Sequence, residues 1–156
     1  CWREELNADQ WISRRSIFQD EYYSNLNSNK DFKLEYLDAR WSNQCNLSCV
    51  YCTPVWSSTW GKLVGEKQRV SNDFAITKHA VKDLKNVLMA GGEPTLIKQN
   101  IELLEMLLEC NPDVHIEMNS NLTWNQDNKI IKLLNQFKNV TIIASFEGAR
   151  QTGKCS

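Results

Sequence analysis

The sequence predicts an α/β fold with parallel strands. Short candidate strands at residues 87–90, 115–118 and 140–146 alternate with segments whose apolar side chains recur at helical spacing. Successive strands joined by helices form right-handed crossovers in a parallel sheet. Small or polar residues follow or end every candidate strand, so the distinctive chemistry gathers where the strands end.

The first part of the chain differs from the rest. Residues 2–30 are polar and aromatic, with the aromatic side chains at roughly helical intervals, and end in an asparagine-rich stretch. We expect a helical lead-in over residues 1–31. From Phe32 apolar residues alternate with polar ones, which predicts a first strand that runs to Trp41. The main domain, residues 32–156, is therefore expected to start at this strand.

The later elements follow in regular order. Helices are expected over residues 72–86, 95–110 and 125–138. Asn111-Pro112 ends the second of them, because the residue before a proline is disfavoured in a helix. The last strand, 140–146, is nearly continuous in apolar residues, which predicts that both of its faces are covered.

Composition narrows the class of protein. The chain has 156 residues, of which 42% are hydrophobic and 24% charged, as in an ordinary globular domain. A net charge of −1 with dispersed Lys and Arg gives no electrostatic footprint for nucleic acid, and no apolar run is long enough to cross a membrane. Because no signal peptide opens the chain, we expect a cytoplasmic protein. It begins at Cys1 rather than Met and stops soon after a strand, so we expect a fragment truncated after about the fourth strand.

Three of the six cysteines are bunched in one loop, at Cys45, Cys49 and Cys52. Three thiolates this close can hold a [4Fe–4S] cluster, and since such a cube normally takes four cysteines, one iron would stay open for a reactant. A structural zinc site needs a fourth ligand, for which His79 and His115 are the candidates. A disulfide with a spare thiol is a third alternative. The other cysteines are scattered, at Cys1, Cys110 and Cys155.

Further polar groups follow the later strands. In Gly91-Gly92-Glu93-Pro94, the glycines allow close approach of a ligand to the backbone, Glu93 offers a carboxylate to an ammonium group, and Pro94 stiffens the turn. The competing interpretation is an ordinary helix start with a solvated glutamate. Short side chains that either form turns or hydrogen-bond sugar hydroxyls end the next two strands: Asn119, Ser120, Asn121 and Ser145.

A phosphate-binding loop is a remote alternative. Residues 148–154 match a Walker A loop up to its last position, where Cys155 replaces the Ser or Thr that would hold magnesium. The sequence predicts no helix after this segment to complete such a site.

Taken in this order, the motifs resemble those of the radical S-adenosylmethionine superfamily, whose members carry a Cys-x3-Cys-x-aromatic-Cys loop after the first strand of a partial (β/α) barrel. Cys45 to Cys52 fits this loop, with Tyr51 as the aromatic residue, and Gly91 to Pro94 is similar to the family's Gly-Gly-Glu-Pro turn. The resemblance implies that Cys45, Cys49 and Cys52 bind three irons of a [4Fe–4S] cluster and that S-adenosylmethionine chelates the fourth. It also implies contacts to S-adenosylmethionine from Tyr51 at the adenine, from the turn Gly91, Gly92, Glu93 and Pro94 at the methionyl ammonium, and from Asn119, Asn121 and Ser145 at the ribose and carboxylate.

The implied activity is reductive cleavage of S-adenosylmethionine to a 5′-deoxyadenosyl radical that abstracts hydrogen from a substrate, with a peptide as candidate substrate and flavodoxin or ferredoxin as electron donor. Cys1-Trp2-Arg3-Glu4-Glu5 looks like the twitch-domain branch, which implies that Cys1 ligates an auxiliary cluster. One departure is Asn119-Ser120-Asn121, where relatives often have Thr-Asn-Gly. The rival class is a non-catalytic iron–sulfur or zinc-binding module.

Overall fold

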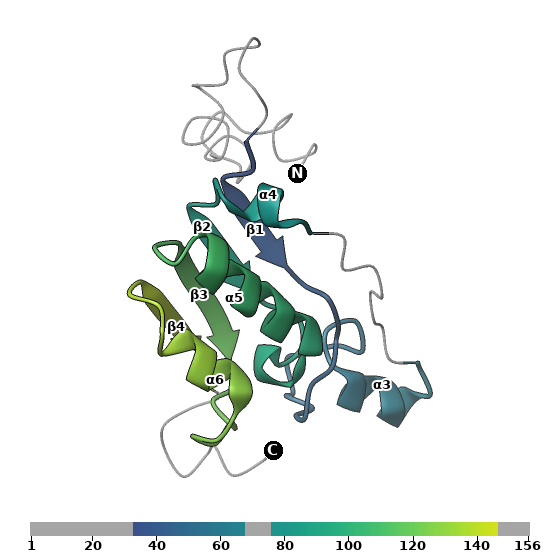
Figure 1. Cartoon of the computed structure of the whole chain (residues 1–156). Coiled ribbons are helices and arrows are strands. Elements are labelled where there is room, and N and C mark those ends of the chain that lie inside the picture. Colours follow the sequence, from purple (N-terminus) through teal and green to yellow (C-terminus); the bar gives the residue numbers. More distant parts are fainter. Residues whose placement is uncertain (1–32, 68–75, 147–156) are drawn as a thin grey trace, which may run out of the picture. The chain divides into compact units, whose positions relative to one another are not determined.

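The computed structural model describes residues 33–67 and 76–146 (Figure 1). These ranges lie in the second of the two units into which the chain divides, Lys33–Ser156. Several expectations therefore fall outside the described residues: the helical lead-in over 1–31, the first part of the helix over 72–86, and the segment that resembles a phosphate loop at 148–154.

The strands form one parallel sheet in the order β1-β2-β3-β4 (Figure 1). Its members are β1 (Tyr36–Ala39), β2 (Asn86–Met89), β3 (His115–Ser120) and β4 (Val140–Ala144). Ala39 pairs with Met89, Met89 with Met118, and Met118 with Ile142, so the carboxyl ends of the strands meet at one edge. The predicted α/β fold with parallel strands is confirmed, and it is consistent with a partial (β/α) barrel.

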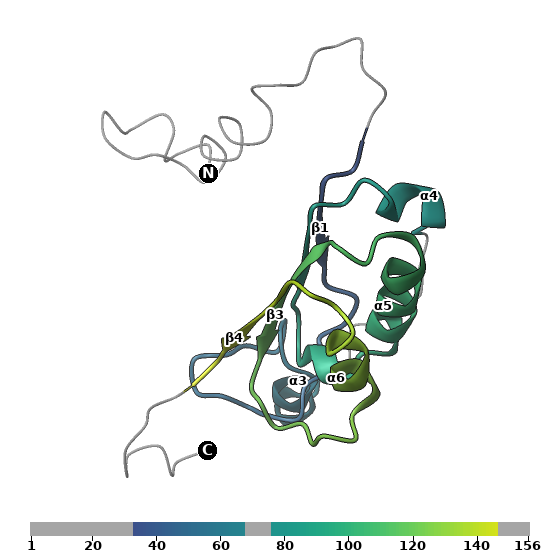
Figure 2. The ribbon, with the colours of Figure 1, turned by 60° about the vertical axis from the view of Figure 1, so that its left-hand side comes forward.

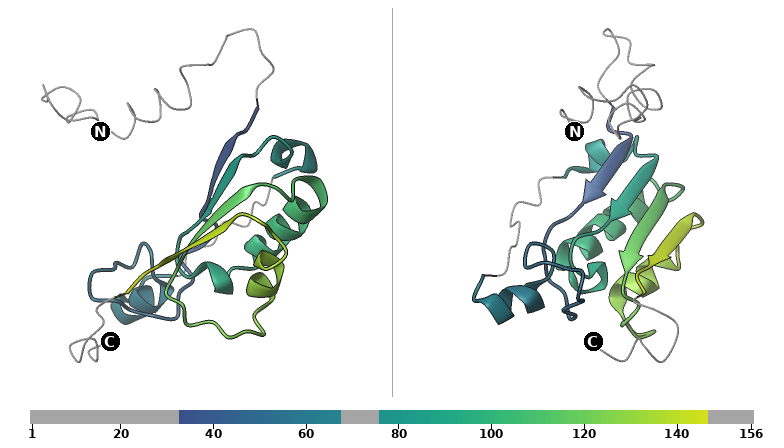
Figure 3. Two further views of the ribbon diagram at one scale, coloured as in Figure 1. Left: turned by 90° about the vertical axis from the view of Figure 1, so that its left-hand side faces the viewer. Right: turned by 180° about the vertical axis from the view of Figure 1, so that it is seen from behind.

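Helices cover one face of this sheet, as Figures 2 and 3 show. They are α4 (Lys78–Val81), α5 (Lys98–Cys110) and α6 (Lys129–Leu134). Alternate residues of the strands, such as Val87 and Ile116, are fully buried against Leu103 and Leu107 of α5 in one hydrophobic core. Within the described ranges, none of the helices combines the length and the apolar composition that crossing a bilayer would require.

The observed helices are shorter than the expected ones, for local reasons. The helix expected over 95–110 is split by Ile97, whose extended backbone separates the 3₁₀ turn η2 (Pro94–Leu96) from α5. α6 begins only after Asn128, whose side chain accepts hydrogen bonds from the next helical amides. In the described part of the segment 72–86, only α4 is helical. A further helix, α3 (Ser58–Val64), lies in a stretch expected to be irregular.

β4 is exposed, which contradicts the prediction that both of its faces are covered. Ile142 and Ile143 remain 40% and 46% exposed, and Phe146 just beyond the strand is 74% exposed. The reason is its place in the sheet: β4 is last in the strand order, and among the described residues nothing pairs with its outer edge. Apolar composition alone did not reveal that position.

Candidate functional site

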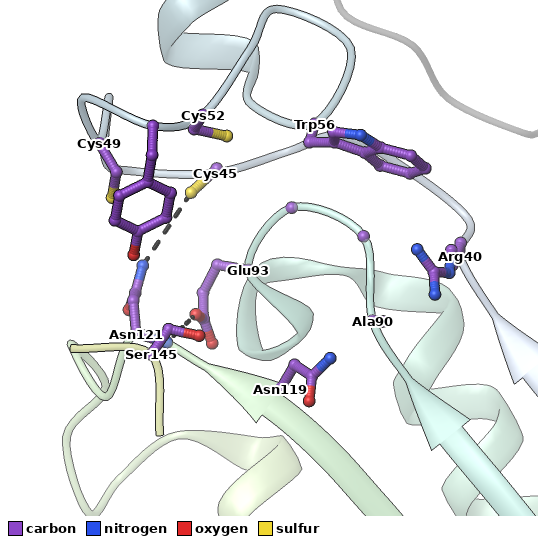
Figure 4. A pocket seen from close by; sticks show the side chains of 13 residues that line it. Arg40, Cys45, Cys49, Cys52, Trp56, Ala90, Glu93, Asn119, Asn121 and Ser145 are labelled. Carbon is purple, nitrogen blue, oxygen red and sulfur yellow. Dashed lines mark hydrogen bonds between the residues drawn. The ribbon is translucent and has the colours of Figure 1, made fainter. Parts of the chain in front are cut away.

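A pocket of about 300 Å³ lies at the carboxyl ends of the strands (Figure 4). Of the candidate residues in the cysteine loop and at the later strand ends, Pro94 and Ser120 do not line it, whereas Arg40, Trp56 and Ala90 line it in addition. The candidates that line it are Cys45, Cys49, Tyr51, Cys52, Gly91, Gly92, Glu93, Asn119, Asn121 and Ser145. The register of the parallel sheet explains this convergence, since all these residues lie at or beyond the carboxyl ends of strands that end together.

The cysteine loop is held by the first residues of α3. Ser57 is fully buried and its hydroxyl donates to the carbonyl oxygen of Leu47 at 2.6 Å. Thr59 Oγ1 donates to the Cys45 carbonyl at 2.7 Å, and Trp60 Nε1 donates to the Cys49 carbonyl at 2.8 Å. All three hydrogen bonds are accepted by main-chain oxygens, so they fix the backbone of the loop without involving its sulfur atoms.

Sequence analysis missed this support. Ser57 is the N-cap of α3, where its side chain accepts from the amide of Trp60, and Gly65 in the left-handed conformation ends the helix. A serine followed seven to eight residues later by a helix-ending glycine is a recognisable signal. The two tryptophans of this stretch, Trp56 and Trp60, are four residues apart, a helical spacing that was overlooked.

The two glycines of the 91–94 turn are required by the chain's own backbone. A Cβ atom added to Gly92 would lie 2.1 Å from the carbonyl oxygen of Gln44, and one added to Gly91 would lie 2.7 Å from that of Ser42. The amides of Gly92 and Glu93 donate to these same two oxygens at 3.1 and 2.7 Å. The sequence predicted that the glycines let a ligand approach the backbone closely. In the structure the backbone of residues 42–44, which leads into the cysteine loop, makes this close approach.

Glu93 is buried and heavily hydrogen-bonded rather than a solvated helix-start residue. It is 1% exposed, and its Oε1 accepts from the amide and hydroxyl of Thr95 and from the hydroxyl of Ser120. Oε2 accepts from the amide of Asn121 at 2.8 Å. Because a carboxylate has about four acceptor sites on its two oxygens, Oε2 retains capacity for a further donor.

Two asparagines at the end of β3 differ in their environment. Oδ1 of Asn119 is buried and has no hydrogen-bond partner among the described residues, and the residue lines the pocket. Such an orphaned acceptor suits a ligand that brings a donor. The side chain of Asn121, in contrast, is used by its neighbours: Oδ1 accepts from the amide and hydroxyl of Thr123, and Nδ2 donates to Asn46 Oδ1.

The backbone after β3 turns at Leu122. Leu122 has a φ of 60°, the left-handed conformation that favours glycine. The hydroxyl of Ser120 supports this turn, because it donates to Glu93 and accepts from the amide of Leu122.

The three cysteine side chains line the pocket without converging on one point. Figure 4 shows the side chains of Cys45, Cys49 and Cys52 spread around their loop. Among the described residues no group of three Cys, His, Asp or Glu side chains is arranged to hold a single metal ion, and no two cysteines form a disulfide. A [4Fe–4S] cubane does not require such a group, because each thiolate binds a different iron.

The environment of Cys45 bears on its charge. Burial raises the pKa of the Cys45 thiol, and the Glu93 carboxylate and Cys52 raise it further, whereas a hydrogen bond from the amide of Leu47 lowers it. That bond joins the Leu47 nitrogen to Cys45 Sγ at 3.5 Å. A metal ligand must be deprotonated, so binding of a cationic metal centre would offset the unfavourable burial of this thiolate.

Arg40 and Trp56 form a second wall of the pocket that sequence analysis did not identify. The guanidinium of Arg40 lies 5.4 Å from the ring centre of Trp56, a cation–π contact, and its Nε donates to Asp38 at 2.7 Å. The hydrogen bond with Asp38 raises the pKa of Arg40. Figure 4 shows both side chains across the glycine turn from the cysteines.

The histidines considered as zinc ligands do not line this pocket. His115 begins β3, at the opposite end from the cysteines, and its ring nitrogens contact Asn86 Oδ1 at 3.1 Å and Thr141 Oγ1 at 2.9 Å. His79 lies in α4 on the helical face of the sheet. His115 thus contacts residues of β2 and β4, and His79 is exposed, so neither ring lies at the cysteine loop.

Comparison with known proteins gives two kinds of match. The model of the Radical SAM superfamily matches residues 40–152. The chain is 27% identical over 111 residues to the sporulation killing factor maturation protein SkfB of Bacillus subtilis (strain 168), which covers 71% of the chain and 26% of that protein. It is 26% identical over 90 residues to the GTP 3′,8-cyclase of Nautilia profundicola, which covers 57% of the chain and 28% of that protein. The matched regions thus span only about a quarter of either curated relative.

Proposed function

The chain belongs to the radical S-adenosylmethionine superfamily, and on this premise we propose that its pocket binds a [4Fe–4S] cluster and S-adenosylmethionine. One observation carries the proposal: the three cysteines, the buried Glu93 and the orphaned acceptor of Asn119 line the same pocket. When bound, the cofactors supply the chemistry, which is one-electron cleavage of the sulfonium to a 5′-deoxyadenosyl radical that abstracts hydrogen from a substrate.

In this proposal Cys45, Cys49 and Cys52 each hold one iron, and the fourth iron is left for the amino and carboxylate groups of S-adenosylmethionine. The rigid hold on the loop backbone supports this role, because a metal site needs its ligands positioned in advance. Glu93 accepts from the methionyl ammonium through the spare capacity of Oε2, and its four bonds to neutral donors keep the carboxylate oriented.

The remaining contacts follow from exposure and hydrogen bonding. Asn119 accepts from a ribose hydroxyl, which satisfies its buried Oδ1. Tyr51 is 68% exposed and lies beside the adenine, where stacking would cover its ring. Ser145 completes the far wall, since its amide donates to the carbonyl of Ser120 at 2.9 Å and fixes the start of the segment after β4.

For the whole protein we propose a peptide substrate, flavodoxin or ferredoxin as electron donor, and a cytoplasmic location. The relative that covers more of this chain is named as a maturation protein of a killing factor, which supports a macromolecular substrate, whereas the other is named for a reaction of GTP. An auxiliary cluster at Cys1 is a separate proposal. Iron content tests it, because a second cubane would raise the iron bound per chain from about four to about eight atoms.

Anaerobic reconstitution of the full-length protein tests the assignment. We expect a brown protein that forms 5′-deoxyadenosine from S-adenosylmethionine and dithionite, and a Cys49→Ala variant that loses this cluster. Cys110→Ala is the matched control, because Cys110 ends α5 outside the pocket and packs against the core. A colourless protein with stoichiometric zinc, or full iron content in Cys49→Ala, would refute the proposal.

A further inference from the structure

We propose that Asn121 is a positioning residue for the iron–sulfur cluster: its side-chain amide donates a hydrogen bond to the sulfur of Cys45 and thereby raises the reduction potential of the cluster. The inference rests on the proposed function, but it gives Asn121 a role other than contact with the ribose or carboxylate of S-adenosylmethionine. Nδ2 of Asn121 lies 4.0 Å from Cys45 Sγ, although the two residues are 76 positions apart in the chain (Figure 4).

The orientation of the Asn121 amide is determined by its neighbours. The backbone amide of Thr123 can only donate, and it lies 3.0 Å from Oδ1 of Asn121. A flipped side chain would place two donors against each other, so Oδ1 must face Thr123 and Nδ2 must face the cysteine loop. The Thr123 hydroxyl reinforces this choice by donating to the same oxygen at 2.6 Å.

A closed ring of side chains keeps the donor beside the loop. Nδ2 of Asn121 donates to Oδ1 of Asn46 at 3.0 Å, and Nδ2 of Asn46 donates to the hydroxyl of Thr123 at 2.7 Å. Asn46 is the residue after Cys45, so the ring joins the turn after β3 directly to the first cluster ligand. One proton of Nδ2 serves Asn46, and the other is available to the sulfur.

The consequence for the cluster is electrostatic. Cys45 is half-buried, and its sulfur accepts from the amide of Leu47 at 3.5 Å and from Nδ2 of Asn121 at 4.0 Å. Hydrogen bonds to the sulfurs are among the factors that set the potential of an iron–sulfur cluster. Donors stabilise the more negatively charged, reduced state more than the oxidised state, so the loss of Nδ2 makes the cluster harder to reduce.

The test is an EPR-monitored redox titration of the full-length protein, reconstituted anaerobically and without S-adenosylmethionine. In Asn121→Ala we expect a midpoint potential that is more negative than in the wild type. In Asn121→Asp we expect a larger shift in the same direction, because a carboxylate replaces the donor at nearly constant shape. Thr123→Val is the control: it removes a hydroxyl from the ring but keeps the amide of Asn121, and we expect a clearly smaller shift.

Each outcome decides the matter. An unchanged potential in Asn121→Ala, or an equal shift in Thr123→Val, overturns the inference, since the ring would then have only a structural role. Loss of iron from Asn121→Ala with retention in Thr123→Val supports the contact between Asn121 and Cys45. The midpoint potential of Asn121→Asp then tests the direction of the shift, which we expect to be negative. Loss of iron from both variants overturns it. A wild type that takes up no cluster refutes the proposed function instead, so the two failures are distinguishable.

Discussion

The two sides of the pocket, next to β1 and next to β4, differ in how closely their residues are packed and hydrogen-bonded. On the side of β1, the backbone of the cysteine loop is bonded to α3 and packed against the glycine turn so closely that no side chain fits between them. On the side of β4, Ser145 follows a strand whose residues are largely exposed. The difference shows that the residues proposed to hold the metal are set before any cofactor binds, whereas the far wall depends on a sparsely covered edge.

The largest effect is expected at the glycine turn. Gly92→Ala places a Cβ 2.1 Å from the carbonyl oxygen of Gln44, and because the obstacle is backbone the turn or the loop must move. We expect a loss of about 3 kcal/mol in the free energy of unfolding, measured by urea denaturation, together with poor cluster retention. Gly61→Ala is the control, since its Cβ would meet nothing closer than 3.4 Å. Equal stability of the two variants would contradict the picture of a fastened loop.

A smaller effect is expected at the start of α3. Ser57→Ala removes the bond to the carbonyl of the half-buried Leu47 and the cap of the Trp60 amide. The expected loss is about 2 kcal/mol in the free energy of unfolding. Thr77→Ala removes the cap of α4 in an exposed position and should lower the free energy of unfolding by at most half as much, about 0.5–1 kcal/mol. Similar losses in the two variants would mean that the contact with the cysteine loop adds nothing.

A gain is expected between the two sides, at the turn after β3. Leu122 has a φ of 60°, and glycine adopts this conformation without the steric cost that a side chain brings. We expect Leu122→Gly to raise the free energy of unfolding by about 1 kcal/mol. Thermal or urea denaturation measures the change, and a destabilised variant would show that packing of the leucine side chain outweighs the backbone term.

The smallest effect is expected on the exposed strand. Ile143→Val shortens a side chain that is 46% exposed, and we expect a change within about 0.5 kcal/mol. Ile116→Val is the matched substitution on the neighbouring strand, where the side chain is fully buried, and should lower the free energy of unfolding by about 1 kcal/mol. An equal loss in both variants would show that β4 is covered in the protein as studied in solution.

The parallel sheet and the place of the candidate site at its carboxyl edge could both be predicted from the sequence. Strand ends are marked locally, by Cys45 after β1, Gly91 after β2 and Asn119 near the end of β3, and parallel topology brings such ends together. The exposure of β4 could not be predicted, because coverage of a strand depends on elements remote from it in sequence. The role of Gly92 was likewise hidden, since its neighbour Gln44 lies in a different segment.

The way α3 grips the loop has an evolutionary consequence. Its hydroxyls and indole bind main-chain groups of the loop, the carbonyl oxygens of Cys45, Leu47 and Cys49 and the amide of Cys45, so these contacts do not depend on the side chains between the cysteines. Val50, 78% exposed, lies between two of the cysteines and takes no part in these contacts. Such positions are free to diversify for new binding partners while the ligand cage beneath them stays unchanged.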